Sequence, residues 1–220
     1  MSNNLHKDDF PIFAEWEKEG KPLHYLDSAS TTHMPACVIK AMEEYETTAR
    51  ANVHRGIYGL SERSSDAYDR ARERVREFIG ARSAREVIFT RNTTEGINLV
   101  AYTLAKKFFS KGDHILVSRT EHHSNFLPWT MLAEEKGVCM DILDPEPDGT
   151  ITPEAVENAL HSRTKMAAFV HISHVLGTIN PIKEIARVLR KNNVLFLVDA
   201  AQSAGHVPID AQDVGCDFLA

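Results

Sequence analysis

Residues 194–202 read Val-Leu-Phe-Leu-Val-Asp-Ala-Ala-Gln, a run of five apolar side chains that ends in a carboxylate. A strand without polar residues is typical of parallel sheets, which crossover helices cover on both faces. Further expected strands lie at 86–90, 114–118, 138–143 and 165–172. The expected helices between them lie at 93–109, 125–136, 153–160 and 181–191. This alternation predicts an α/β fold with a mostly parallel sheet sandwiched by helices.

The N-terminal part of the chain lacks this alternation, because glycine and proline interrupt residues 1–34. Beyond them we expect a helix from Pro35 to about residue 50, a loop over 51–63 and an amphipathic helix over 64–79. Arginines and carboxylates alternate on that second helix at three- and four-residue spacing, which predicts a solvated face with paired charges. The expected division is an N-terminal segment, 1–34, and a large domain, 35–220.

The last five residues, Cys-Asp-Phe-Leu-Ala, begin another apolar strand. Native chain ends are usually exposed and polar, so an end inside an apolar strand leads us to expect a chain that is cut here. On this expectation the fold is truncated before the sheet is complete.

Composition narrows the classes of function. The formal net charge of −6, from 25 basic and 31 acidic residues, disfavours a general nucleic-acid binder. Cys37, Cys139 and Cys216 lack the spacing of a zinc site and are too few for a disulfide framework, so we expect packing residues. No apolar run approaches the ~20 residues that span a bilayer, and the first residues lack a secretory signal. We therefore expect a cytoplasmic protein without a membrane partner.

Candidate functional residues follow the expected strands, because ligands bind at the carboxyl ends of parallel strands. Residues 91–96, Arg-Asn-Thr-Thr-Glu-Gly, open a helix. Free backbone N–H groups and the hydroxyls of Thr93 and Thr94 suit a phosphate there. The alternative is a plain cap, with Asn92 as N-cap and Glu95 closing a capping box, and the two interpretations are compatible.

Histidines follow two other strands. The segment 121–125, Glu-His-His-Ser-Asn, offers an imidazole that suits ring stacking or proton transfer, and the alternative is a pair of loop histidines in water. The segment 173–181 carries His174, for which we favour a polar contact with the same ligand. A metal site that includes His171 is disfavoured, because no carboxylate or cysteine has suitable spacing.

Asp199-Ala-Ala-Gln202 follows the most apolar strand. A carboxylate there either caps the next turn or pairs with a protonated pyridine nitrogen. Together the four segments supply a phosphate cradle, a stacking imidazole and a pyridinium carboxylate at one edge of one sheet. This set fits pyridoxal 5'-phosphate better than a nicotinamide cofactor, because no Gly-x-Gly-x-x-Gly follows the first strand.

Six stretches of the chain resemble one known family. They are Tyr25-Leu-Asp-Ser-Ala29, Val53-His-Arg-Gly56, Thr93-Thr-Glu-Gly-Ile-Asn-Leu-Val100, Glu121-His-His-Ser-Asn125, Val175-Leu-Gly-Thr178 and Val198-Asp-Ala-Ala-Gln202. The sequence is similar to class V aminotransferases, in particular to the group II (Suf-type) cysteine desulfurases and selenocysteine lyases. The resemblance implies a homodimeric enzyme of pyridoxal-phosphate-dependent transferase fold type I, with 35–220 as an incomplete cofactor-binding domain.

The resemblance implies a role for each candidate residue. His122, the catalytic candidate, would stack on the cofactor ring and assist proton transfer, and Asp199 would pair with the pyridine nitrogen. The other residues implied to hold the cofactor are Thr93 and Thr94 at the phosphate, and His174 and Gln202 at the ring hydroxyl. The residues implied at the substrate side and dimer interface are Ala29, His54 and Arg55.

Two departures from the family pattern matter. The family usually has asparagine where this chain has His174, which still donates a hydrogen bond but changes the surroundings of the ring hydroxyl. In the family, the Cys-Asp-Phe strand leads into Ser-Gly-His-Lys, whose lysine forms a Schiff base with the cofactor; the persulfide-carrying cysteine and a small domain lie further on. None of the 11 lysines here stands in that context. We therefore expect the chain to lack these parts and to be inactive alone.

The implied reaction converts L-cysteine to L-alanine and leaves the sulfur as an enzyme persulfide for iron–sulfur cluster assembly, by way of a sulfur-acceptor protein. Selenocysteine lyase or another class V enzyme is the first alternative. The second is a catalytically inactive fragment, and the third is a histidine metal site.

Overall fold

The computed structural model describes residues 6–220, with the backbone alone at 105 and 106. The chain divides into two units, Met1–Glu73 and Arg74–Ala220. The division that the sequence suggested, after residue 34, stays a prediction. The helix that follows residue 34 belongs with the first unit, where Tyr45 Oη lies 2.8 Å from Ser64 Oγ on the next helix.

The first unit is helical, with no strand among its described residues. It contains η1 (Lys7–Asp9), α1 (Pro11–Glu17), α2 (Ala36–Thr48) and most of α3 (Gly59–Phe78). The helix expected from residue 64 begins earlier, at Gly59, so the loop expected over 51–63 is too long. Ser61 explains the difference: its hydroxyl accepts from the Gly56 N–H at 3.1 Å and donates to the Asn52 carbonyl at 2.6 Å, which ties the loop to the first helical turn.

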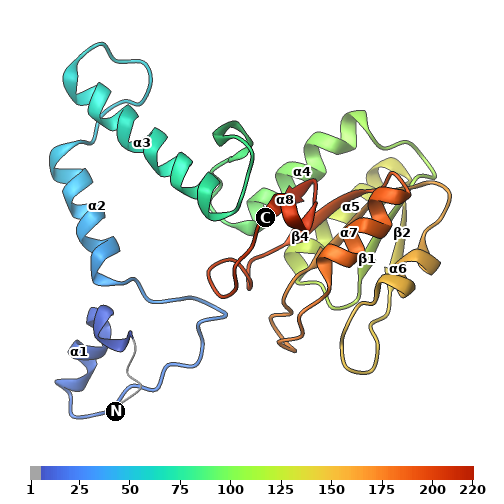
Figure 1. The fold of residues 1–220 in the computed structure, drawn as a ribbon, viewed down its shortest axis with the longest axis horizontal. Coiled ribbons are helices and arrows are strands. Elements are labelled where there is room, and N and C mark those ends of the chain that lie inside the picture. Colours follow the sequence, from blue (N-terminus) through green and yellow to red (C-terminus); the bar gives the residue numbers. More distant parts are fainter. Residues whose placement is uncertain (1–5) are drawn as a thin grey trace. The chain divides into compact units, whose positions relative to one another are not determined.

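The second unit is built on a parallel sheet with the strand order β2-β1-β3-β4-β5 (Figure 1). The strands are β1 (His114–Ser118), β2 (Cys139–Leu143), β3 (Thr164–Val170), β4 (Leu195–Asp199) and β5 (Phe218–Leu219). The helices are α4 (Thr93–Lys107), α5 (Leu127–Lys136), α6 (Pro153–Ala159), α7 (Ile182–Lys191) and α8 (Ala211–Val214). Two short 3-10 turns, η2 (Ala84–Glu86) and η3 (His123–Asn125), precede α4 and α5. The predicted α/β fold is confirmed.

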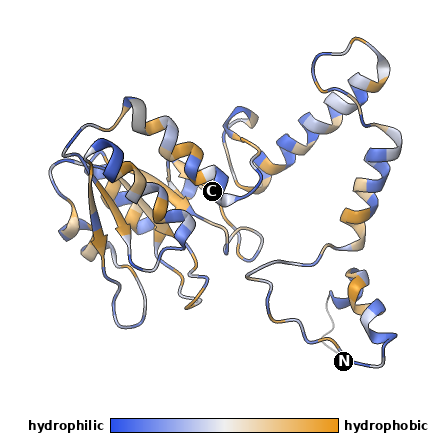
Figure 2. Ribbon diagram, turned by 180° about the vertical axis from the view of Figure 1, so that it is seen from behind, coloured by the Kyte–Doolittle hydropathy of each residue, from blue (hydrophilic) through white to orange (hydrophobic). Residues whose placement is uncertain are grey.

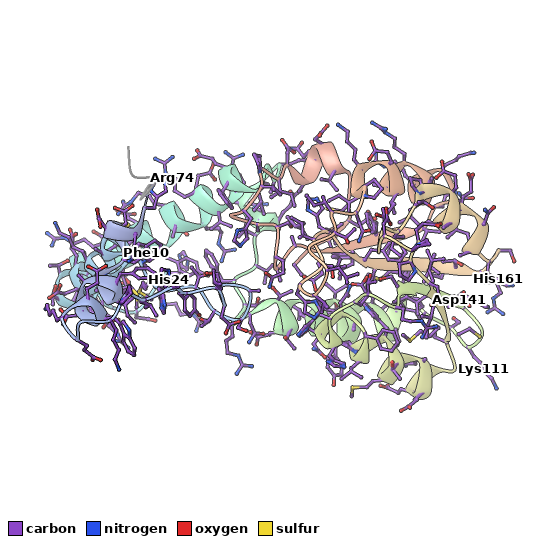
Figure 3. The ribbon with its side chains drawn as sticks, turned by 90° about the horizontal axis from the view of Figure 1, so that it is seen from below. Phe10, His24, Arg74, Lys111, Asp141 and His161 are labelled. Carbon is purple, nitrogen blue, oxygen red and sulfur yellow. The ribbon has the colours of Figure 1, made fainter. Side chains whose placement is uncertain are left out.

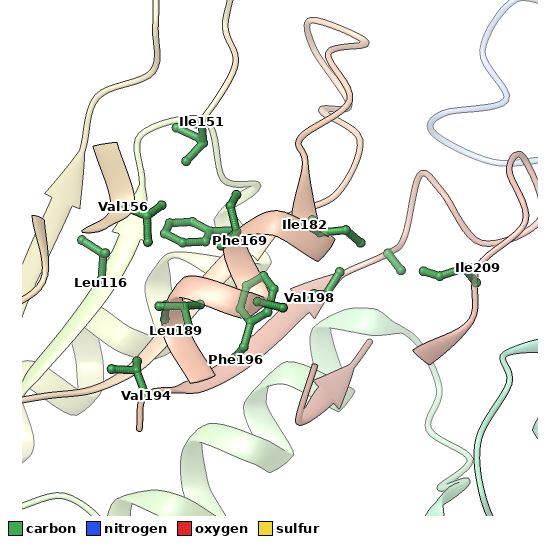
Figure 4. Close-up of a cluster of buried hydrophobic side chains, with 14 residues drawn as sticks. Leu116, Ile151, Val156, Phe169, Ile182, Leu189, Val194, Phe196, Val198 and Ile209 are labelled. Carbon is green, nitrogen blue, oxygen red and sulfur yellow. The ribbon is translucent and has the colours of Figure 1, made fainter. Parts of the chain in front are cut away.

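Successive strand residues point to opposite faces, and in β1, β3 and β4 both faces are largely buried. Leu116, Phe169 and Phe196 face one cluster with α6 and α7 (Figure 4). Ile115 and Leu197 face the other cluster, with α4 and α5. Figure 2 shows the result as hydrophobic strands between helices of mixed hydropathy. Burial on both faces is the reason for the unbroken apolar runs in the sequence.

The strand expected at 86–90 is wrong. Glu86 ends η2, and the sheet of the described residues does not include the segment from Val87 to Thr90, although Val87 has extended dihedral angles. Ile88 is 66% exposed and borders an open hollow of about 1260 Å³ that Phe218 also lines. An apolar segment becomes a strand only where a neighbour completes the hydrogen-bond ladder, which the sequence of the segment does not reveal.

The cysteines only partly match their expected packing role. Cys37 and Cys139 are exposed, so this prediction is wrong for both. Cys216 is partly buried and packs against the core beside α7, and burial raises the pKa of its thiol to about 11. Its thiolate is therefore a minor species at neutral pH.

No helix among residues 6–220 is long and apolar enough to cross a membrane.

Phe169→Ala tests the packing of the cluster in Figure 4. Phe169 has no exposed surface, so we expect a loss of about 3 to 5 kcal/mol in the free energy of unfolding, from lost burial and from the cavity left behind. Urea denaturation followed by circular dichroism measures it. The matched control is Phe78→Ala, at a side chain that is 61% exposed, for which we expect a change within about 0.5 kcal/mol. Equal losses in the two variants would contradict the assigned core.

Candidate functional site

Loops after three strands meet at one edge of the sheet. β1, β3 and β4 are neighbours in parallel pairing, with Val117 opposite Ala168 and Val170 opposite Asp199. The N-terminus of α4 lies at the same edge, because Thr94 Oγ1 is 2.7 Å from Ser124 Oγ in the loop after β1. The structure therefore brings together the segments that the sequence singled out.

Asn92 caps α4 as expected, since its side chain accepts from the Glu95 N–H at 2.9 Å. The capping box closes differently. Glu95 Oε2 accepts from the backbone N–H of Arg91 at 2.5 Å, one residue before the N-cap, and the Arg91 guanidinium holds the same carboxylate at 3.0 Å. The N–H groups of Thr93 and Thr94 lie in the first helical turn, where no helical carbonyl can accept from them. They remain available to an anion.

His122 and His174 come from different loops and lie together at this edge. Their ring centroids are 4.8 Å apart in an edge-to-face arrangement. The Ser124 N–H donates to His122 Nδ1 at 3.1 Å, which fixes one side of the His122 ring. Partial burial, and then the neighbouring His122 imidazole, lower the pKa of His174. His174 is therefore mostly neutral at pH 7 and able to donate or accept a hydrogen bond.

Asp199 ends β4 and is almost completely buried, with 2% of its surface exposed. One carboxylate oxygen accepts from the Ala201 N–H at 3.0 Å. Burial raises the pKa of Asp199, while this hydrogen bond and the rings of His122 and His174 act in the opposite direction. A buried carboxylate is stabilised by a cationic partner. A protonated ring nitrogen would be such a partner.

Glu121 is the residue at this edge that sequence reasoning missed. Ser118 Oγ donates to one of its oxygens at 2.5 Å, and Asn125 Nδ2 donates to the other at 2.6 Å. Burial raises the pKa of Glu121 to about 7, although these hydrogen bonds oppose the rise, and the charge of Asp199 adds to it. The signal in the sequence that could have indicated Glu121 is its position between an apolar strand and His122.

The roles of four further predicted residues stay predictions. Gln202 lies partly buried in the turn after β4, and its contact with a cofactor stays a prediction. Ala29, His54 and Arg55 are exposed residues of the first unit. The backbone of His54 is left-handed, with φ of 67°, and its ring packs edge to face on Tyr68 at 5.6 Å. The roles of these three at the substrate side or dimer interface also stay predictions.

The opposite edge of the sheet holds structural contacts. Lys111 and His161 lie together on this side of the second unit (Figure 3), and Arg163 donates to the Lys111 carbonyl at 2.8 Å. The His114 ring stacks on His161 at 4.0 Å, and its Nδ1 lies 2.8 Å from Asp141 Oδ2. Across residues 6–220, no three His, Cys, Asp or Glu side chains form a metal-ligand set.

Comparison with known proteins now identifies the family. Residues 24–220 match the family described as Aminotransferase class-V. The chain belongs to the class V aminotransferases. A probable cysteine desulfurase of Halalkalibacterium halodurans is 46% identical over 211 residues, which make up 96% of this chain and 52% of that protein. The cysteine desulfurase of Pectobacterium atrosepticum is 42% identical, with the same coverage. This class V chain thus spans about half the length of the curated relatives it matches.

Solved structures agree with this family. The apo cysteine desulfurase of Thermococcus onnurineus superposes with a TM-score of 0.91 at 35% identity, over 100% of this chain and 52% of that one. The cysteine desulfurase CsdA of Escherichia coli gives 0.86 at 29% identity, over 100% and 53%. A structure described as SspA in complex with cysteine gives 0.83 at 29% identity, over 90% and 56%. Fold type I of the pyridoxal-phosphate-dependent transferases, which the resemblance implied, is confirmed by these neighbours.

Glu121→Gln tests the buried carboxyl group. A carboxyl whose pKa rises from 4.5 to about 7 on folding stabilises the fold below pH 4.5, and this contribution is lost as the pH rises through about 7. We expect the wild type to lose stability relative to Glu121→Gln over this window, at no more than about 1.4 kcal/mol per pH unit. Urea denaturation at several pH values measures the difference.

The matched control for this titration is Glu134→Gln, which changes an exposed carboxylate on α5. We expect this exposed substitution to change the free energy of unfolding by no more than about 0.5 kcal/mol. A stability difference between the wild type and Glu121→Gln that does not change with pH would contradict the raised pKa of Glu121.

Proposed function

We propose that the whole protein is a pyridoxal-phosphate-dependent cysteine desulfurase. The observation that carries this proposal is the convergence of Thr93, Thr94, His122, His174 and Asp199 at the carboxyl edge of β1, β3 and β4, in a chain whose relatives are named cysteine desulfurases. The structural neighbour described in complex with cysteine supports L-cysteine as the substrate.

The polar groups at this edge of the sheet suit both the phosphate and the ring of the cofactor. The first turn of α4 offers N–H groups and the hydroxyls of Thr93 and Thr94 to the phosphate. The buried Asp199 carboxylate offers a negative charge to the pyridine nitrogen. His122 would cover the face of the ring, and His174 and Gln202 would face the ring hydroxyl.

When bound, pyridoxal phosphate supplies an electron sink that weakens the bonds at the α-carbon of an amino acid. Asp199 would favour a proton on the ring nitrogen, because a cationic ring would add to the Ala201 N–H in stabilising the buried carboxylate. His122 has its Nδ1 lone pair occupied by the Ser124 N–H, so its Nε2 is the atom that exchanges a proton with substrate. His174 restrains the His122 ring from one side.

The overall reaction transfers one sulfur atom. L-cysteine and an enzyme thiol give L-alanine and an enzyme persulfide, which a sulfur-acceptor protein takes on for iron–sulfur cluster assembly. We propose that the thiol and the Schiff-base lysine belong to parts of the protein outside these 220 residues, so that this chain alone does not turn over. We further propose a cytoplasmic homodimer.

Assay of the protein from its complete coding sequence tests the proposal. With pyridoxal phosphate and L-cysteine, we expect alanine and sulfane sulfur in equal amounts. In Asp199→Asn the charge-assisted contact is lost, and a loss of about 1.5 to 3 kcal/mol corresponds to a kcat lower by roughly 10- to 100-fold. The matched control, Asp141→Asn, removes the carboxylate that pairs with His114 and should keep kcat.

Alanine formation from selenocysteine but not from cysteine would replace the proposal with selenocysteine lyase. Transamination without sulfur release would contradict both activities.

A further inference from the structure

A directed chain of hydrogen bonds runs from the N-terminus of α4 to His122. A backbone N–H can only donate, so the Ser124 N–H, 3.1 Å from His122 Nδ1, requires a lone pair there in the neutral ring. The ring hydrogen then sits on Nε2. Ser124 Oγ lies 2.8 Å from the same Nδ1 and therefore donates to it as well.

Thr94 completes the chain. Its Oγ1 lies 2.7 Å from Ser124 Oγ, whose own hydrogen is directed to His122, so the Thr94 hydroxyl donates to Ser124. Each hydroxyl thereby polarises the next one. Thr94 is also one of the two hydroxyls assigned to the phosphate, and a phosphate oxygen is a stronger acceptor than a serine hydroxyl. An occupied phosphate site would thus compete for the first hydrogen of the chain.

We propose that Ser124 is a positioning residue that holds His122 in its Nε2–H tautomer and couples the ring to the phosphate site through Thr94. The second part of this inference rests on the proposed function, whereas the first part rests on the hydrogen bonds alone. The titratable side chains near the His122 ring are His123, His174 and Asp199. Ser124 bears no charge, so its replacement leaves their charges in place.

Long-range proton–nitrogen NMR of the 15N-labelled 220-residue chain tests the tautomer at a pH of about 8.5, where imidazoles are ordinarily neutral. We expect the Nε2–H tautomer of His122 to dominate in the wild type. In Ser124→Ala, loss of one donor to Nδ1 should lower the ratio of Nε2–H to Nδ1–H by roughly 5- to 10-fold. Ser124→Thr keeps the hydroxyl and should restore the wild-type ratio, and the backbone amide spectrum shows whether each variant is folded.

Inorganic phosphate tests the coupling in the same samples. We expect phosphate to shift the amide signals of Thr93 and Thr94 in both the wild type and Ser124→Ala, and to move the His122 ring signals in the wild type only.

An unchanged tautomer ratio in Ser124→Ala would overturn the positioning role. Ring signals that follow phosphate equally in both proteins would overturn the coupling. Absence of any amide shift at Thr93 and Thr94 would instead count against the phosphate site of the proposed function, and the tautomer measurement would still decide the role of Ser124.

Discussion

The parallel pairing of β1, β3 and β4 is the constraint on which the site depends. It aligns the carboxyl ends of strands whose following loops carry residues 121–125, 171–181 and 199–202. The pairing holds because both faces are buried, with Phe169 and Phe196 on one side and Trp129 on the other. A one-residue slip of β4 would turn Asp199 to the opposite face of the sheet. The chemistry of this edge therefore depends on the packing of the core.

Two acidic groups share this edge, and burial raises the pKa of both. Glu121 is held by Ser118 and Asn125, and Asp199 by the N–H of Ala201. Because the charge of Asp199 also disfavours the charged form of Glu121, a cationic ring at this edge would relieve the repulsion. Under the proposed function, a protonated pyridine would fit these carboxylates better than an anionic ring would. The phosphate would lie apart from them, at the N-terminus of α4.

Apolar runs and strand-end motifs in the sequence were sufficient to predict β1, β3 and β4, the cap at Asn92 and the meeting of Thr94, His122 and Asp199. The features that these patterns could not predict depend on which distant segments contact each other in the folded chain. The segment 86–90 is as apolar as a strand, but its place outside the sheet depends on its neighbours. Glu121 gave a weak signal because its burial and its partners become visible only in the folded loop. The exposure of Cys37 and Cys139 likewise depends on which faces find a packing partner.

We propose above all that Asp199 makes this edge a site for a protonated pyridine. Nitrogen NMR of ring-15N pyridoxal phosphate bound to the chain tests it directly, with the free cofactor at the same pH as the reference. We expect a protonated ring nitrogen in the wild type and an unprotonated one in Asp199→Asn. An unprotonated nitrogen in both proteins, with the phosphate bound, would contradict it.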